Sequence, residues 1–138
     1  MDRQLIREKL ESLRRCLARV QTKTPDSAAA LAADPDLQDI LVLNLSRAVQ
    51  LAVDVASHLL STRGSPPPAT MGAAFRALGD AGVLAEETAA ALARAVGFRN
   101  IAVHNYEEID WEIVFAICSR GVEDFRAFAA AVTREASL

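Results

Sequence analysis

Cysteine is scarce in this chain, and its scarcity disfavours two kinds of site. The 138 residues include two cysteines, Cys16 and Cys118, which lie far apart and outside any Cys-x-x-Cys or Cys/His cluster. A structural zinc site would lack ligands, and a thioredoxin-like redox pair would lack its second thiol. His58 also has no third metal ligand at a useful spacing. We therefore expect two buried core thiols, no metal and no other cofactor.

The chain also lacks an excess of positive charge and a long apolar run. Its formal net charge is −3, with 15 Lys and Arg against 18 Asp and Glu. This disfavours a protein that coats nucleic acid without sequence preference, because such binding depends on cations that neutralise phosphates, but it permits a local RNA site. No apolar stretch approaches the roughly 20 residues of a membrane-spanning helix, and the charged start MDRQLIREKLESLRR does not resemble a signal peptide. We expect no membrane association and a cytoplasmic location.

The chain does contain enough apolar residues for one core. Its hydrophobic fraction is 51% and its charged fraction is 24%, values that suit a compact domain. No segment shows the alternating pattern of a strand, whereas apolar residues recur at three and four positions. The sequence therefore predicts a single all-α domain over residues 1–138.

Five helical segments are predicted from these spacings and from the residues that interrupt them. Thr24-Pro25-Asp26 ends the first segment, an Ala-rich turn follows, and Asp34-Pro35 supplies a cap and a first residue for the second. The second segment has two apolar stripes, which predicts two buried neighbours. Ser65-Pro66-Pro67-Pro68 forms a connector. The predicted architecture is a bundle of four long helices and one short helix, over about 2–21, 35–63, 71–80, from 85 and from 110.

The segment from Arg99 to Tyr106 holds the densest group of reactive side chains. Arg99, Asn100, His104 and Tyr106 fall close together in the sequence. On an ideal helix Arg99 and Tyr106 share a face, but His104 points about 140° away from Arg99, because each residue turns the helix by about 100°. One straight helix therefore cannot bring all three together. Either the helix ends before His104, or a second copy of the chain completes the site across a two-fold axis.

The order of these residues follows a known pattern. Arg99, His104 and Tyr106 spell Arg-x4-His-x-Tyr, which resembles the HEPN nuclease superfamily and in particular its HepT toxin branch. The resemblance covers nearly the whole chain, including the runs Ala74–Leu78 and Val96–Asn100. It implies a HEPN-type helical bundle.

The resemblance also implies a function: a toxin that acts as a homodimeric, metal-independent endoribonuclease. Arg99 would hold the scissile phosphate and His104 would transfer protons as a ribose 2′-OH attacks, with Asn100 and Tyr106 in supporting roles. The implied partner is a cognate MNT-type nucleotidyltransferase antitoxin, which silences such toxins by transferring AMP to the motif tyrosine, here Tyr106. The substrate would be RNA, and the family suggests tRNA as one candidate.

A second polar group lies on the long second segment. Arg47, Gln50, Asp54 and His58 follow one another at spacings of three and four, which places them in one row on an otherwise apolar helix. This row is either a wall of the RNA cleft or a polar seam between protomers, or else an ordinary solvent face with a weak Asp54–His58 contact. The sequence favours the solvent face. Asn44 interrupts an apolar stripe and is expected to make a buried hydrogen bond.

Four carboxylates follow the motif and would repel phosphate, those of Glu107, Glu108, Asp110 and Glu112. We expect them to cap the last helix and to stabilise protonated His104, which would raise its pKa above the ordinary value of about 6.5. An NMR titration of His104 measures this directly, and a lower pKa would contradict it.

Two other functions fit the same sequence. One is a non-catalytic helical subunit that binds a nucleotidyltransferase or presents its substrate. The other is an all-α interaction dimer with an inactive motif. Cleavage of RNA by the purified chain separates the ribonuclease from both alternatives, because neither of them cuts RNA.

Overall fold

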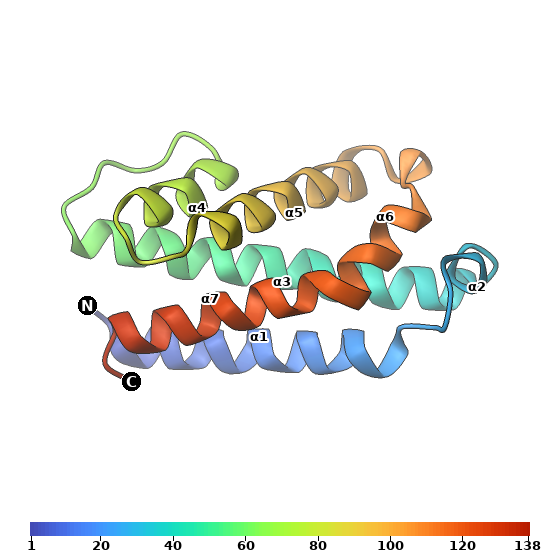
Figure 1. Cartoon of the computed structure of the whole chain (residues 1–138), viewed down its shortest axis with the longest axis horizontal. Coiled ribbons are helices and arrows are strands. Elements are labelled where there is room, and N and C mark those ends of the chain that lie inside the picture. Colours follow the sequence, from blue (N-terminus) through green and yellow to red (C-terminus); the bar gives the residue numbers. More distant parts are fainter.

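The computed structural model describes the whole chain, residues 1–138, as a bundle of helices without a β-strand (Figure 1). Four long helical rods run along the molecule: α1, α3, α5, and a rod in which a π-helical segment, η2, joins α6 to α7. The all-α prediction of four long helices and one short helix, α4, is confirmed, with one additional short helix, α2. The helices are α1 (Arg3–Lys23), α2 (Ala28–Ala32), α3 (Pro35–Thr62), α4 (Met71–Asp80), α5 (Glu86–His104), α6 (Trp111–Ala116), η2 (Ile117–Gly121) and α7 (Val122–Glu135).

Short polar side chains cap the starts of α1, α3 and α4. The Asp2 carboxylate accepts a hydrogen bond from the first turn of α1, Asp34 does the same for α3, and the Thr70 hydroxyl does so for α4. Pro35 occupies the first position of α3, where no backbone donor is needed. At the other end of α3, Gly64 adopts a φ of +72°, a conformation that glycine reaches without strain. The predicted bounds of α3 and α4 are therefore confirmed.

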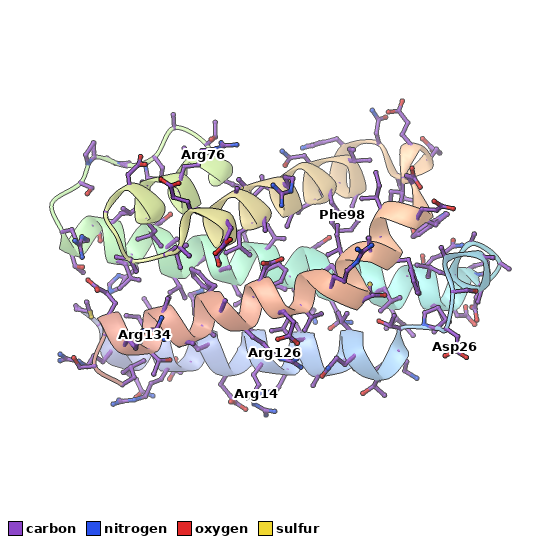
Figure 2. All side chains as sticks on the ribbon, viewed as in Figure 1. Arg14, Asp26, Arg76, Phe98, Arg126 and Arg134 are labelled. Atoms are coloured by element: carbon purple, nitrogen blue, oxygen red, sulfur yellow. The ribbon has the colours of Figure 1, made fainter.

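The central helix of the bundle is α3. It packs against α1 along one side and against α4 and α5 along the other, while α7 crosses in front of it (Figure 1). Both predicted apolar stripes are buried, and they form part of a single core cluster of 34 residues. Because two faces of α3 are covered, its remaining polar face is left to carry the site described below. Phe98 fills the space between α5 and α6 (Figure 2).

By length and composition alone, α3 contains an 18-residue window that is apolar enough to cross a membrane. In the structure, 56% of that window is buried inside the protein. The sequence shows no unbroken apolar run because polar residues recur along the helix. A core helix covered on two sides meets the same composition test, and α3 is such a helix.

Two features differ from the predicted layout. The Ala-rich segment forms a helix, α2, because the Ser27 hydroxyl caps it and Leu31 is fully buried. The predicted last helix is interrupted by the π-helical segment η2, which inserts a wider turn between α6 and α7. The buried face of α7 includes Phe125, Phe128 and Val132.

Candidate functional site

The helix that carries the motif, α5, extends to His104, which is therefore its last helical residue. Asn105 leaves the helix with a φ of −149°, while its backbone N–H still donates to the Ile101 carbonyl at 2.8 Å. Of the two alternatives left open by the sequence, the one in which the helix ends before His104 is wrong. Because Arg99 and His104 stand on one regular helix, their side chains leave it about 140° apart. Within one protomer these two groups diverge.

Arg99 is held by hydrogen bonds that connect three helices. Its Nη2 donates to Gln50 Oε1 on α3 at 3.3 Å, and Gln50 Nε2 donates to Asp54 Oδ1 at 2.9 Å. Lys9 Nζ on α1 pairs with the other oxygen of Asp54 at 3.1 Å. The Gln50 amide has one orientation that satisfies both neighbours, since a guanidinium only donates and a carboxylate only accepts. Lys9 offsets the charge of Asp54, so Arg99 is oriented without being paired to an acid.

The polar row on α3 thus does more than face solvent. Gln50 and Asp54 are half-buried and link α1 to α5. The predicted Asp54–His58 contact is absent, because Asp54 is taken by Lys9 and Gln50. His58 Nε2 accepts a hydrogen bond from the backbone N–H of Asp2 at 3.0 Å and helps to close the far end of the bundle.

Tyr106 lies just beyond α5, in the single 3₁₀ turn Tyr106–Glu108. Its hydroxyl donates to Asp39 Oδ1 on α3 at 2.9 Å, and its ring meets Trp111 edge-on with centroids 6.1 Å apart. Partial burial, followed by the hydrogen bond to Asp39 and the charge of Asp39, raises the pKa of Tyr106 to about 12. The phenol is therefore neutral at pH 7, although the residue remains 40% exposed.

Asp39 is the candidate functional residue that the sequence analysis missed. Its partner Tyr106 lies 67 residues further along the chain. One feature of the sequence could have pointed to Asp39. It lies eleven residues before Gln50, a spacing that puts both residues on the same face of α3, about 16 Å apart. Tyr106 contacts Asp39 and Arg99 contacts Gln50. Both motif side chains therefore lie along this one face of α3.

Two apolar side chains near these contacts have no cover within the chain. Leu43 lies between Asp39 and Gln50 on the same face of α3 and is 51% exposed. Val103 lies one turn after Arg99 on α5 and is 53% exposed. Both side chains are available for contact with another protein surface.

His104 and Asn100 are both exposed on α5. None of the five ion pairs in the structure includes His104, so the acidic residues after the motif form no direct pair with it. Asp110 caps α6, because its Oδ1 accepts a hydrogen bond from the backbone N–H of Glu112 at 2.9 Å. The capping role predicted for this acidic stretch is confirmed, and its electrostatic effect on His104 stays a prediction.

A groove of about 700 Å³ lies between α1 and α3 and reaches Gln50. Three arginines line it, Arg15 and Arg19 from α1 and Arg47 from α3, and no carboxylate does. Arg15 has a weak pair with Glu11 at 3.7 Å, while Arg19 and Arg47 are in none of the ion pairs. A groove with three cations and no acid suits a ligand that carries several phosphates.

The remaining sequence candidates lie in the core. Cys16 and Cys118 are buried free thiols, as predicted, and burial raises the pKa of both, that of Cys118 to about 11. Asn44 is buried, and its side-chain amide donates to the Ile40 carbonyl at 2.8 Å, which confirms the predicted hydrogen bond. No three His, Cys, Asp or Glu side chains come together in a way that could hold a metal ion.

Comparison with known proteins identifies the family. A family model described as ribonuclease HepT-like matches residues 6–132, a range that includes Arg99, His104 and Tyr106. The chain belongs to the ribonuclease HepT-like family. The match to this HepT-like family begins in α1 and ends in α7, so the whole bundle carries the likeness and not the motif alone.

Two curated relatives of this HepT-like chain are nucleases by name. The mRNA nuclease HepT of Shewanella oneidensis is 30% identical over 131 residues, which cover 95% of this chain and 98% of the relative. The tRNA nuclease HepT of Aphanizomenon flos-aquae is 36% identical over 76 residues, which cover 55% of this chain and 52% of the relative. The first relative therefore matches over nearly its full length.

Solved structures of toxin–antitoxin complexes contain the same fold. One crystal structure of a toxin–antitoxin with AMP-PNP superposes with a TM-score of 0.89 at 28% identity, over 95% of this HepT-like chain and 98% of the other. The tri-AMPylated HEPN toxin of S. oneidensis in complex with its MNT antitoxin gives a TM-score of 0.88 at 29% identity, over 94% and 97%. The HEPN-type fold predicted from the sequence is confirmed.

Proposed function

We propose that this HepT-like protein is the toxin of a prokaryotic toxin–antitoxin pair, an endoribonuclease that acts in the cytoplasm and is neutralised by a nucleotidyltransferase antitoxin. The observation that carries the proposal is the likeness over nearly the full length to the S. oneidensis mRNA nuclease HepT, together with the Arg-x4-His-x-Tyr motif on and just after α5. The HEPN toxin of similar structure is AMPylated and in complex with an MNT antitoxin. We assign a partner and a modification of the same kinds to this protein.

The active site is formed by two copies of the chain. Arg99 and His104 leave α5 about 140° apart, so one protomer cannot direct both at the same phosphate. A two-fold axis near α3 and α5 places Arg99 of one protomer opposite His104 of its partner. Leu43 and Val103, exposed on the faces that carry these contacts, supply apolar area for that interface.

The side chains suit cleavage by an internal nucleophile. A ribose 2′-OH attacks the adjacent phosphorus, so one proton must leave the nucleophile and another must reach the departing 5′-oxygen. His104 performs these transfers, because an imidazole gains and loses a proton near neutral pH. Arg99 donates hydrogen bonds to the phosphate oxygens as negative charge builds there, and Asn100 supports it as a further donor. These steps need no metal ion, since the nucleophile is already part of the substrate.

RNA reaches this site along the arginine-lined groove between α1 and α3. Arg15, Arg19 and Arg47 contact successive phosphates, and Gln50 joins the end of the groove to Arg99. Asp54 was also predicted to line the RNA cleft. It does not contact the RNA itself but orients Gln50 through a hydrogen bond. The groove supplies locally the positive potential that a chain of net charge −3 lacks as a whole.

Transfer of AMP to Tyr106 is the neutralising step. Tyr106 follows His104 by two residues and is 40% exposed, so an antitoxin active site can reach its hydroxyl. The added nucleotide places a phosphate and a base beside the catalytic imidazole. Both its negative charge and its volume exclude RNA from the cleft.

The test uses purified protein, wild type and His104→Ala, incubated with total RNA and with tRNA in the presence of EDTA. We expect the wild type to cleave, and the variant to lose about 100-fold or more in rate with unchanged helical circular dichroism. Antitoxin and ATP should then stop cleavage by the wild type. Equal cleavage by both proteins would contradict the role of His104, and a wild type that leaves every RNA intact would favour the non-catalytic subunit.

A further inference from the structure

The hydrogen bond between Tyr106 and Asp39 joins two segments that no other side-chain hydrogen bond joins. Tyr106 comes from the turn after α5, whereas Asp39 lies in the second turn of α3. The phenol oxygen and Asp39 Oδ1 are 2.9 Å apart, and the hydroxyl donates. None of the ion pairs in the structure includes Asp39, so no cation withdraws its negative charge from this contact.

We propose that Asp39 is a catalytic residue for the modification of the protein itself, the base that accepts the Tyr106 proton as the phenol oxygen attacks a nucleoside triphosphate. The inference rests on the proposed transfer of AMP to Tyr106 and adds a role for a residue outside the Arg-x4-His-x-Tyr motif. It makes the toxin supply part of the chemistry by which its antitoxin silences it.

The reaction balances with the groups named. The Tyr106 oxygen forms a bond to the α-phosphorus of ATP, the bond from that phosphorus to the β-phosphate oxygen breaks, and pyrophosphate leaves. The proton on the phenol oxygen passes to the Asp39 carboxylate. The partner nucleotidyltransferase supplies the bound ATP, and the phenol and the carboxylate come from this chain.

A base is needed because the phenol is held in its neutral form. Burial and the adjacent carboxylate keep the pKa of Tyr106 at about 12, so very little phenolate exists at pH 7. The proton on the phenol oxygen becomes strongly acidic once that oxygen begins to bond to phosphorus. A carboxylate can then take the proton. Protein kinases use an aspartate for the same transfer from a substrate hydroxyl.

Asp39 is the acceptor that the Tyr106 hydroxyl contacts, because Asp39 Oδ1 takes the side-chain hydrogen bond that this hydroxyl donates. Trp111 covers one edge of the ring and has no acceptor to offer. After the transfer, the tyrosyl oxygen has no proton to donate and carries an anionic phosphate. Once Asp39 has released the accepted proton to water, its carboxylate repels that phosphate. The modified side chain therefore leaves α3.

The test measures transfer of labelled AMP from α-labelled ATP to the purified chain by its cognate nucleotidyltransferase antitoxin, under single-turnover conditions. We expect Asp39→Asn to lower the transfer rate by about 100-fold or more, because general-base catalysis contributes about that much. Asp39→Glu, which keeps the carboxylate, should restore part of the rate. Asp36→Asn is the matched control, because Asp36 is an exposed acid one turn earlier on α3.

A pH series separates a base from a residue that only holds the ring in place. If Asp39 takes the proton, the ratio of the Asp39→Asn rate to the wild-type rate should rise about tenfold per pH unit, because the variant then depends on phenolate formed by hydroxide. The antitoxin is the same in both reactions, so its own pH dependence cancels. A low ratio that stays constant with pH would overturn the assignment of Asp39 as the base.

The remaining outcomes distinguish this inference from the proposed function. Label on the wild type and equal label on Asp39→Asn would overturn the role of Asp39 and leave the modification of Tyr106 standing. No label on the wild type would overturn both. Label on the Tyr106→Phe variant would move the modification to another residue.

Discussion

The divergence of Arg99 and His104 on α5 predicts how two inactive variants behave when they are mixed. In the proposed dimer there are two catalytic pairs, and each pair combines Arg99 of one protomer with His104 of the other. Arg99→Ala removes the guanidinium from both pairs, and His104→Ala removes the imidazole from both. We expect either variant alone to lose about 100-fold or more in RNA cleavage. In a dimer with one protomer of each kind, one pair lacks both groups and the other pair is intact.

The cleavage rate expected after mixing follows from the number of intact Arg99–His104 pairs. Random exchange of protomers makes half of the dimers mixed, and each mixed dimer keeps one of its two pairs, so the mixture should reach about a quarter of the wild-type rate. Mixed dimers isolated with two different affinity tags should reach about half. The assay is the initial rate of cleavage of a fluorogenic RNA at equal total protein concentration.

A different result would refute the two-copy site. If the isolated mixed dimers cleave no faster than the two parent variants, Arg99 and His104 act from the same chain, and the argument from the 140° separation fails. Arg94→Ala is the matched control: Arg94 is an exposed arginine on α5, and it lines a different groove beside Ile113. That variant should keep the wild-type rate.

Three further predictions follow from the groove, the core and the tyrosine. Arg19→Ala and Arg47→Ala should each raise the KM for RNA and reduce the slope of log affinity against log salt by about 0.7 to 0.9, and unchanged slopes in fluorescence anisotropy would place the RNA elsewhere. Phe128→Ala removes a fully buried ring that meets Phe75 edge-on at 5.8 Å, and we expect a loss of about 3–5 kcal/mol in urea unfolding. A loss below about 1 kcal/mol would contradict this packing. Tyr106, the single tyrosine, should ionise near pH 12 in an absorbance titration, against 10.0 for an ordinary phenol. Since the folded pKa is the higher one, its contribution to stability is complete below about pH 10 and is lost as the pH rises towards 12. A midpoint near 10 would contradict the contact with Asp39.

The positions of the helices could be predicted because local residues determine them. Asp34 and Pro35 start α3, and Gly64 with the prolines after it prevents α3 from continuing. These effects act within a few residues, so they can be predicted from the local sequence. The apolar spacing along α3 likewise predicted two buried faces, and the structure buries both.

The features that the sequence did not predict depend on contacts between distant segments or on small changes of register. Lys9 reaches Asp54 across 45 positions and Tyr106 reaches Asp39 across 67, and neither spacing has a local signature. The π-helical segment η2 widens one turn without changing the residue types around it. Its position therefore depends on how α6 and α7 pack and cannot be read from periodicity.

The candidate site was predicted in part for the same reason. The motif identified Arg99, His104 and Tyr106 from their order along the chain, and the family match includes all three. The role of Gln50 in orienting Arg99 is visible only when α3 and α5 are side by side. Whether Arg99 and His104 meet depends on a second copy of the chain, which periodicity on one helix can suggest but cannot place.

Both ends of the polypeptide lie at one end of the bundle (Figure 1). Asp2 contacts His58 near the end of α3, and Arg3 Nε donates to the Ala136 carbonyl at 2.8 Å, whereas Tyr106 meets α3 near its start. Along α3 the two regions are separated by about 28 Å. A fluorophore or surface linker on either terminus is thus remote from Tyr106. The protein can be tethered to a biosensor with its reactive end facing the flow, so that the arrival of RNA and of the antitoxin is timed on the same immobilised molecules.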